Sequence, residues 1–157
     1  MNMTAPKCYV LVGPPGSGKS TWVENQKLVK DYVYVSTDMY VEAYARSQGK
    51  TYSEVFQEIM PEAVEHMCQD VRDARAVLSN IIWDQTSTTI ASRTRKFRML
   101  PDYEMIAVVM PEVSIPELFR RVNSRPGKQI PESVMHSMIE GYQEPTLEEG
   151  FSKIIKL

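Results

Sequence analysis

A glycine-rich turn between an apolar run and a helical pattern is the feature that most limits how this chain can fold. The apolar residues 8–12 lead directly into the segment Gly13-Pro14-Pro15-Gly16-Ser17-Gly18-Lys19-Ser20. Two glycines separated by four residues and followed by Lys-Ser form the complete P-loop pattern, which requires a strand before it and a helix after it. Glycines let the backbone curl so that successive N–H groups point into one hollow. The sequence therefore predicts a strand over 8–12, a phosphate-holding turn and a helix over 19–28.

The residues of this turn indicate how a polyphosphate would be held. Lys19 is expected to reach the β- and γ-phosphates, and the hydroxyl of Ser20 is expected to ligate Mg²⁺. The motif indicates a nucleoside triphosphate and does not identify the group that receives the phosphate. The predicted nucleotide-binding residues here are Gly13, Pro14, Pro15, Gly16, Ser17, Gly18, Lys19, Ser20 and Thr21.

Predicted strands and helices alternate along the rest of the chain. The strands are continuous apolar runs rather than alternating ones, which is typical of a parallel sheet covered by helices on both faces. We therefore expect an α/β fold of this kind. Further strands are predicted over 32–35, 80–83, 105–110 and 151–157, and further helices over 38–48, 53–79 with Pro61 inside it, 89–100, 115–123 and after Pro131.

Length and charge exclude several classes of protein. The chain has 157 residues, which predicts a single domain, and its 18 Lys and Arg against 20 Asp and Glu give a net charge of −2. This balance argues against a protein that coats nucleic acid non-specifically, although it allows a local basic channel. Cys8 and Cys68 are far apart, which favours the cytoplasm and no zinc site. The apolar run 9–12 is too short to span a membrane.

Two acidic residues follow predicted strands. Asp38 comes just after the strand 32–35, and Asp84 directly follows the strand 80–83. Ligands of open parallel sheets lie outside the carboxyl ends of the strands, at the edge that also carries the P-loop. Asp84 therefore fits an acid that holds Mg²⁺, and Asp38 fits a general base for an attacking hydroxyl. The alternative for Asp38 is that it only caps a helix.

Basic residues gather in two segments. The first lies on the predicted helix 89–100, where we expect Arg95, Lys96 and Arg98 to form a solvated face together with local glutamates. The second surrounds Pro126-Gly127, and an arginine-bearing segment ahead of such a break resembles a lid that could close on the transferring phosphoryl group. Arg125 is the residue we expect to act there. The members of the two groups are Arg93, Arg95, Lys96 and Arg98, and Arg120, Arg121, Arg125 and Lys128.

Taken together, these segments resemble the kinase domain of polynucleotide 5′-hydroxyl kinases, both the phage type and the animal kinase-phosphatase type. The resemblance covers essentially the whole chain. It implies Asp38 as the catalytic aspartate, Asp84 in the acid position, and Arg125 where the phage enzymes carry a phosphate-stabilising arginine, with Arg121 as a further contact to the nucleotide. The segments that carry it are GPPGSGKSTW, DYVYVSTDMY, IIWDQTSTTIASRTRKF, RRVNSRPGKQIPESVM and GYQEPTLEEGFSKI.

Three positions depart from the pattern of this family. Ser36-Thr37 precede Asp38, where the family usually has Asn-Arg. Val41 stands where the phage enzymes have an arginine that grips an acceptor phosphate, and Ser87 replaces an asparagine. The departures concern the acceptor side more than the donor side. We find no phosphatase Asp-x-Asp motif, so we expect a kinase domain over residues 1–157 with no phosphatase domain.

The sequence therefore predicts a P-loop kinase that uses ATP and Mg²⁺ to phosphorylate the 5′-hydroxyl end of DNA or RNA. Lys19, Asp38 and Arg125 are the predicted catalytic residues, and Ser20 and Asp84 are the predicted metal ligands. A small-molecule or nucleoside kinase on the same scaffold is the first alternative, which Val41 and the acidic balance favour. A nucleotide-binding regulatory module is the second, although such a module would need no acceptor base.

Overall fold

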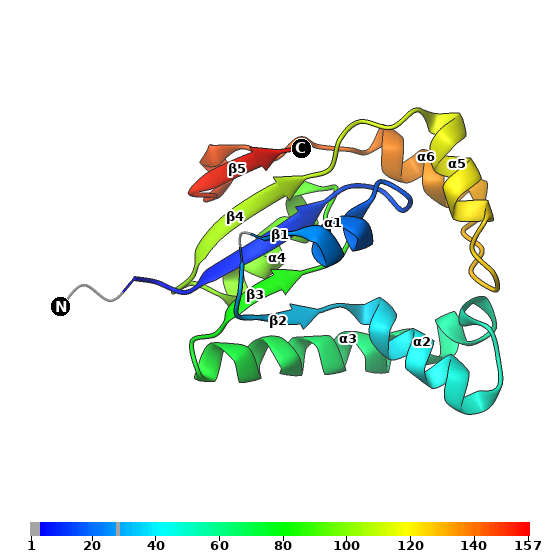
Figure 1. Ribbon diagram of the computed structural model, residues 1–157, viewed down its shortest axis with the longest axis horizontal. Coiled ribbons are helices and arrows are strands. Elements are labelled where there is room, and N and C mark those ends of the chain that lie inside the picture. The colour runs from blue at the N-terminus through cyan, green and yellow to red at the C-terminus, as the bar shows by residue number, and fades with distance from the viewer. Residues whose placement is uncertain (1–3, 28) are drawn as a thin grey trace.

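The computed structural model describes residues 4–27 and 29–157 and is built on a five-stranded sheet. Its strands are β1 (Lys7–Val12), β2 (Tyr32–Val35), β3 (Asn80–Trp83), β4 (Glu104–Val109) and β5 (Lys153–Lys156). The strand order is β2-β3-β1-β4-β5, and every neighbouring pair is parallel. All five carboxyl ends therefore point to one edge, on the right of Figure 1.

Within the described residues, six α-helices connect these strands. Figure 1 shows α1 in front of the sheet, α4 behind it and α3 beside β2. It also shows α2, α5 and α6 beyond the carboxyl ends of the strands. The helices are α1 (Lys19–Asn25), α2 (Thr37–Gln48), α3 (Tyr52–Ala76), α4 (Ile90–Met99), α5 (Ile115–Asn123) and α6 (Glu132–Glu140).

The sheet is buried on both faces. On one face, alternate residues of β1 such as Val10 pack with Trp83 and with Val71 of α3. On the other face, Leu11 packs in a second cluster to which Trp22 of α1 contributes. Because side chains on successive strand residues point to opposite faces, a strand covered twice must be apolar throughout. The predicted α/β fold with helices on both faces is confirmed.

The register of the strands brings the three candidate loops together. Val10 of β1 and Val35 of β2 both pair with Trp83 of β3. The backbone N–H of Asp84 donates to the carbonyl of Val35 at 2.8 Å, and the N–H of Gly13 donates to the carbonyl of Thr86 at 2.9 Å. The turns after β1, β2 and β3 therefore form one continuous edge.

The element boundaries differ from the sequence predictions in a few places. Helix α1 ends at Asn25, and Leu28, the predicted end of this helix, lies outside the described residues. Pro61 lies inside α3 without ending it. The last strand is shorter than predicted, covering Lys153–Lys156. Among the described residues, no helix is both long and apolar enough to cross a membrane.

Candidate active site

A cavity of about 640 Å³ opens at the carboxyl edge of the sheet, and we name it the edge cavity. Lys19 and Ser20 reach it from the P-loop, and Asp38 reaches it from α2. The turn after β3 contributes Asp84, and the segment after α5 contributes Arg125. The three predicted catalytic residues and both predicted metal ligands thus line one cavity, although they come from four separate parts of the chain.

The P-loop is closed on itself in this structure. Gly18 has φ 103° at the start of α1, a left-handed conformation that side chains with a Cβ rarely adopt. The Lys19 Nζ donates to the carbonyls of Gly13 and Pro14 at 3.0 Å each, and the Ser17 hydroxyl donates to Pro14 at 2.7 Å. The lysine therefore lies across the turn whose amide groups would hold phosphates.

The charge of Lys19 is balanced by its neighbours. Burial lowers the pKa of this ammonium from its ordinary value of 10.5 to about 8. Asp84 and Asp38 raise the pKa, whereas Arg125 and Lys128 lower it. A partly buried cation facing acids at a cavity wall is placed to exchange part of this pairing for an anionic ligand.

Asp38 lies in the first turn of α2 but does not cap the helix. The N-cap is Ser36, whose side chain accepts from the backbone N–H of Asp38 at 3.1 Å. The Asp38 carboxylate instead accepts from the Tyr52 hydroxyl at 2.6 Å through Oδ1 and from Lys128 Nζ at 2.8 Å through Oδ2. The capping alternative for Asp38 is therefore wrong, and Asp38 lines the edge cavity while its carboxylate is bound by these two side chains.

The pKa of Asp38 is set by opposing effects. Burial by itself would raise the pKa of this carboxyl group. The ion pair with Lys128 and the hydrogen bonds from Lys128 and Tyr52 outweigh that effect, so the pKa lies below its ordinary value of 3.8. Asp38 is therefore ionised at neutral pH, as a general base must be.

Asp84 follows β3 and is held by Tyr34 of β2. The Tyr34 hydroxyl donates to Asp84 Oδ2. Burial raises the pKa of this carboxyl, and the Tyr34 hydrogen bond and the charge of Lys19 lower it in part. One carboxylate and the Ser20 hydroxyl at the same cavity provide hard oxygen donors, a set that fits Mg²⁺ because this ion usually keeps waters and substrate phosphates as its other ligands.

The two predicted arginine contacts are placed differently. Arg125 lines the edge cavity. Arg121 of α5 donates through Nη1 to the Gly16 carbonyl at 2.9 Å and pairs with Glu117 at 3.0 Å. Arg121 therefore holds α5 against the P-loop. No motion of the segment after α5 is on view in a single structure, so its role as a lid stays a prediction.

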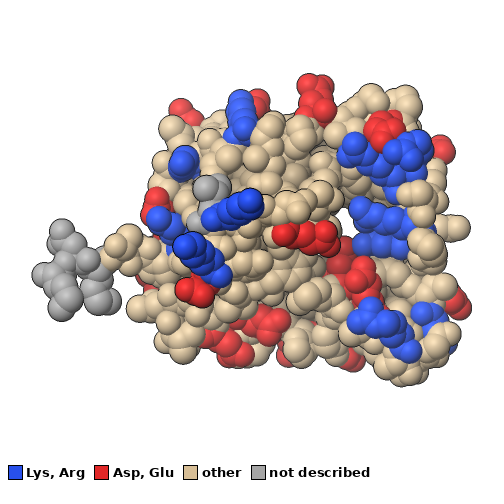
Figure 2. All heavy atoms as spheres, viewed as in Figure 1, with Lys and Arg blue, Asp and Glu red and all other residues tan. Residues whose placement is uncertain are grey.

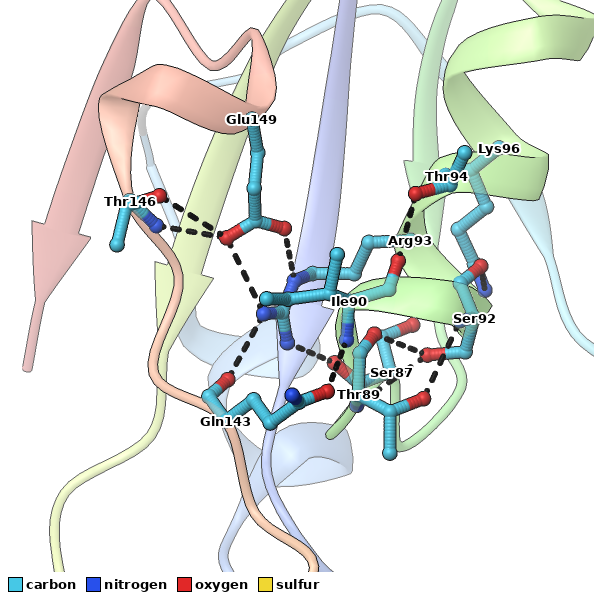
Figure 3. Close-up of polar contacts among 10 residues, drawn as sticks. All are labelled: Ser87, Thr89, Ile90, Ser92, Arg93, Thr94, Lys96, Gln143, Thr146 and Glu149. Atoms are coloured by element: carbon cyan, nitrogen blue, oxygen red, sulfur yellow. Dashed lines mark hydrogen bonds and ion pairs between the residues drawn. The ribbon is translucent and has the colours of Figure 1, made fainter.

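The first basic segment is only partly the solvated face that the sequence analysis expects, since Arg95 and Arg98 are exposed but Lys96 is not. Arg93 is fully buried, and its guanidinium binds Glu149 at 2.7 Å and the carbonyls of Ser87 and Gln143 at 2.8 Å each (Figure 3). Lys96 is also buried, with Nζ 5.1 Å from the centre of the Trp83 ring. The expected face is wrong for Lys96 because the apolar stem of a lysine packs well over an indole.

This network fixes the turn that carries Asp84. Thr89 caps α4, and the neighbouring Arg93 ties the carbonyl of Ser87 to Glu149 near the end of the chain (Figure 3). Ser87 has φ 47°, a left-handed conformation, and its buried hydroxyl has no hydrogen-bond partner among the described residues. Asparagine adopts this conformation more readily than serine. Ser87, which stands where the polynucleotide kinases that this chain resembles carry asparagine, therefore costs backbone strain.

Three contributors to the site were missed by the sequence reasoning or given no role there. Tyr34 and Tyr52 hold the two carboxylates, and Lys128 pairs with Asp38. Tyr52 lies 14 residues from Asp38, and Lys128 lies 90 residues from it. No spacing rule predicts contacts at such separations, and only the position of Lys128 in a basic segment gave a signal. Val41 is fully buried with α3 residues in the α2–α3 core.

Basic and acidic side chains meet near this edge. Figure 2 shows blue side chains gathered on the right of the molecule, over the end where Figure 1 places α5 and α2, with acidic side chains beside them. A second cavity, which we name the side cavity, adjoins the first and shares Asp38, Asp84 and Arg125 with it. Arg46, in the last turn of α2, and Lys50, just after this helix, line the side cavity but not the edge cavity.

The fold and the P-loop edge define a P-loop kinase-type domain. A family model described as an AAA domain matches residues 9–145, and the chain belongs to this family. A bifunctional polynucleotide phosphatase/kinase of Schizosaccharomyces pombe is 29% identical over 150 residues, which are 92% of this chain and 32% of that protein. The chain thus spans about a third of the length of that relative.

Solved structures give the same architecture. A chain of the Pnkp1/Rnl/Hen1 RNA repair complex has a TM-score of 0.68 and 22% identity, covering 89% of this chain and 45% of that one. A fungal RNA kinase has a TM-score of 0.56 and 17% identity, covering 99% of this chain and 38% of that one. These likenesses show the shared fold, and together with the yeast relative they confirm the resemblance to polynucleotide kinases.

Proposed function

We propose that this chain transfers the γ-phosphoryl group of ATP to the 5′-hydroxyl of a DNA or RNA end. The observation that carries the proposal is the meeting of Asp38 with Lys19, Ser20 and Asp84 at one cavity. A nucleotide-binding module needs the P-loop, but it does not need a second, ionised carboxylate facing it. The similarity to a polynucleotide phosphatase/kinase over 92% of the chain supports a nucleic-acid end as the acceptor.

On this proposal, the donor side is the P-loop with its flanking cations. The P-loop residues 13–21, through the backbone N–H groups that Pro14 and Pro15 lack, and the ammonium of Lys19 hold the β- and γ-phosphates. Arg125 contacts the transferring group, and Arg121 supports the loop through Gly16 and contacts the nucleotide. Ser20 and Asp84 would hold Mg²⁺, which neutralises phosphate charge when bound.

On the acceptor side, Asp38 acts as the general base. The proton of the 5′-hydroxyl moves to the Asp38 carboxylate as the hydroxyl oxygen bonds to the γ-phosphorus. The bond from that phosphorus to the bridging oxygen of ADP breaks, so ADP leaves and a 5′-phosphate remains. The positive charges of Lys19 and Arg125 stabilise the equatorial oxygens while this exchange takes place.

Label transfer tests this assignment directly. Incubation with γ-labelled ATP and Mg²⁺ is expected to label a 5′-hydroxyl oligonucleotide and to leave the same oligonucleotide unlabelled when it already carries a 5′-phosphate. The Lys19→Ala variant, checked for an unchanged circular dichroism spectrum, serves as the inactive control. Labelling of nucleosides or sugars alone would instead support a small-molecule kinase, which the buried Val41 favours because that position offers no cation to an acceptor phosphate.

Two further parts of the proposal concern the setting of the reaction. We take residues 1–157 as a single kinase domain without phosphatase chemistry. Both cysteines are free thiols, and Cys8 is buried in the sheet, where burial raises its pKa. Free thiols and the use of ATP fit a cytoplasmic location.

A further inference from the structure

Each oxygen of the proposed general base accepts one hydrogen bond in this structure, and the Asp38 side chain is 48% exposed. Asp38 Oδ1 accepts from the Tyr52 hydroxyl at 2.6 Å, and Oδ2 accepts from Lys128 Nζ at 2.8 Å. The Lys128 side chain is 12% exposed and its Nζ lies 4.4 Å from the centre of the Tyr52 ring. An acceptor hydroxyl therefore meets a carboxylate that is already paired with a nearly buried cation.

The segment that carries Lys128 is fixed in place on both sides of this residue. The carbonyl of Gly127 accepts from the backbone N–H of Ser53 at 3.1 Å. The backbone N–H of Gln129 donates to the Ser53 hydroxyl at 2.8 Å. Gly127 has φ 69°, and a Cβ there would lie 2.9 Å from the Cβ of Thr51, so the backbone approaches the start of α3 more closely than any other residue type allows. Lys128 is thus held over Asp38 by its own backbone.

A neutral hydroxyl does not compensate for breaking this ion pair. It donates one hydrogen bond to the carboxylate, but it offers the displaced ammonium no anionic partner, and an unpaired, nearly buried charge is costly. A phosphate near the attacking hydroxyl offers that partner, because a charge-assisted bond to a phosphate oxygen replaces the one to the carboxylate. Arg46, Lys50 and Arg125 line the side cavity next to Lys128, and the acids Asp38, Glu42 and Asp84 line it as well, so an anionic chain would follow the cationic part of this wall.

We propose that Lys128 is a positioning residue that holds Asp38 in an ion pair until the phosphate next to the 5′-terminal nucleoside of the acceptor draws its ammonium away. The inference rests on the proposed function and adds a source of specificity to it. Val41 is buried and offers no cation, so on this proposal Lys128, in the segment after α5, recognises the first phosphate of the acceptor. An acceptor with a hydroxyl but without this phosphate leaves the base in its ion pair with Lys128.

A pair of acceptors that differ only in one charge tests this exchange. We would compare two short 5′-hydroxyl oligonucleotides whose first linkage is either a phosphodiester or a neutral methylphosphonate, with the wild type and with Lys128→Ala. In the wild type, loss of the charge is expected to lower kcat/KM about tenfold. In Lys128→Ala, the kcat/KM values for the two acceptors are expected to agree within about twofold. The value for the neutral acceptor is expected to be at least as high as it is with the wild type.

Control variants separate this role from a structural one. Lys153→Ala, at an exposed position of β5, is expected to keep the wild-type ratio of kcat/KM between the phosphodiester and the methylphosphonate acceptor. Lys128→Arg is expected to keep most of this ratio, because a guanidinium also binds phosphate. Equal losses on both acceptors, an unchanged ratio, or a raised KM for ATP alone would each overturn the inference. Failure of the wild type to label either oligonucleotide would instead refute the proposed function itself.

Discussion

At the scale of single residues, the site depends on which carboxylate is bound by which donor. Asp38 and Asp84 both follow strands and both accept a tyrosine hydroxyl, yet their pKa values move in opposite directions. Burial raises the pKa of Asp84, with only partial relief from Tyr34 and Lys19. At Asp38 the effect of burial is outweighed by Lys128, so this carboxyl stays ionised to lower pH. The two acids are therefore suited to different tasks.

The Asp38→Asn variant is expected to lose phosphoryl transfer by about a hundredfold or more while keeping ATP affinity. Asparagine has nearly the same shape and still accepts the Tyr52 hydrogen bond, but its amide cannot take the acceptor proton. Single-turnover labelling of a 5′-hydroxyl oligonucleotide, beside calorimetric titration with ATP and Mg²⁺, measures the two effects separately. A parallel loss of ATP binding would place Asp38 on the donor side, and retained turnover would remove it from the chemistry.

Lys96 gives a residue-scale prediction that depends on pH. Burial lowers its pKa from 10.5 to about 8, a shift that corresponds to about 3 kcal/mol of destabilisation of the charged form. Below pH 8 the ammonium is charged in both the folded and unfolded states, so the full penalty applies. As the pH rises from 8 to 10.5, the folded state is neutral while the unfolded state is charged, and the penalty disappears.

Lys96→Met is therefore expected to raise the free energy of unfolding by about 1–2 kcal/mol at pH 7 and by much less near pH 10.5. The gain at pH 7 is smaller than the full penalty because the charged lysine also contacts the Trp83 ring, and methionine does not replace this cation–π contact. Urea unfolding of both proteins at the two pH values measures this difference. Lys153→Met, at an exposed position, provides the control and is expected to change little at either pH. A gain that is equal at both pH values would show that packing, and not charge, is responsible.

At the scale of elements, the edge of the sheet is held by contacts between segments far apart in the chain. Arg93 on α4 joins the β3–α4 turn to Glu149, 56 residues away, and Arg121 on α5 joins the P-loop, 105 residues away. The segment after α5 is fixed to the start of α3 through Ser53. Each turn that carries a site residue is therefore positioned by a second element and not only by its own strand.

Loss of the buried partner of Arg93 is expected to cost far more than loss of an exposed ion pair. Glu149→Ala leaves a fully buried guanidinium without its carboxylate, which is expected to cost about 3–5 kcal/mol of unfolding free energy. Asp102→Ala removes the partner of Arg75, a pair whose side chains are nearly half exposed, and is expected to cost at most about 1 kcal/mol. Urea unfolding at pH 7 compares the two, and similar costs would mean that Arg93 finds other partners or water.

Elements were largely predictable from the sequence, whereas the partners of site residues were not. The apolar runs and the glycine turn give the strands, the P-loop and the order of helices because these features depend on neighbours in the chain. The burial of Arg93 and the pairing of Lys128 with Asp38 depend on tertiary contacts, so periodicity carries no signal for them. Asp38 and Asp84 both line the edge cavity, because parallel strands share one carboxyl edge, and their roles there stay predictions.

At the scale of the whole molecule, the charge distribution matters more than the net charge of −2. Because Arg93 and Lys96 are buried, the helix α4 contributes less to a basic surface than its sequence indicates. The cations that remain at the site line the two adjoining cavities, and they come from the start of α1, from the end of α2 and the loop after it, and from the segment after α5. An acidic protein can therefore still present a short basic path to an anionic chain.

Binding of an oligonucleotide is expected to weaken with salt, but only with the modest slope that a few phosphate contacts produce. Each neutralised phosphate of a single strand adds about 0.7 to the slope of log affinity against log salt concentration. Lys50→Ala, at the side cavity, is expected to reduce the slope by about this amount, whereas Arg95→Ala on α4, which lines neither cavity, is expected to leave it unchanged. Fluorescence anisotropy of a labelled 5′-hydroxyl oligonucleotide between low and high salt, with the wild type and both variants, measures these slopes. An affinity of the wild type that does not change with salt would favour a small-molecule acceptor, because a nucleoside or sugar releases no counterions. A reduced slope in Arg95→Ala would place the path of the nucleic acid over α4 instead of along the side cavity.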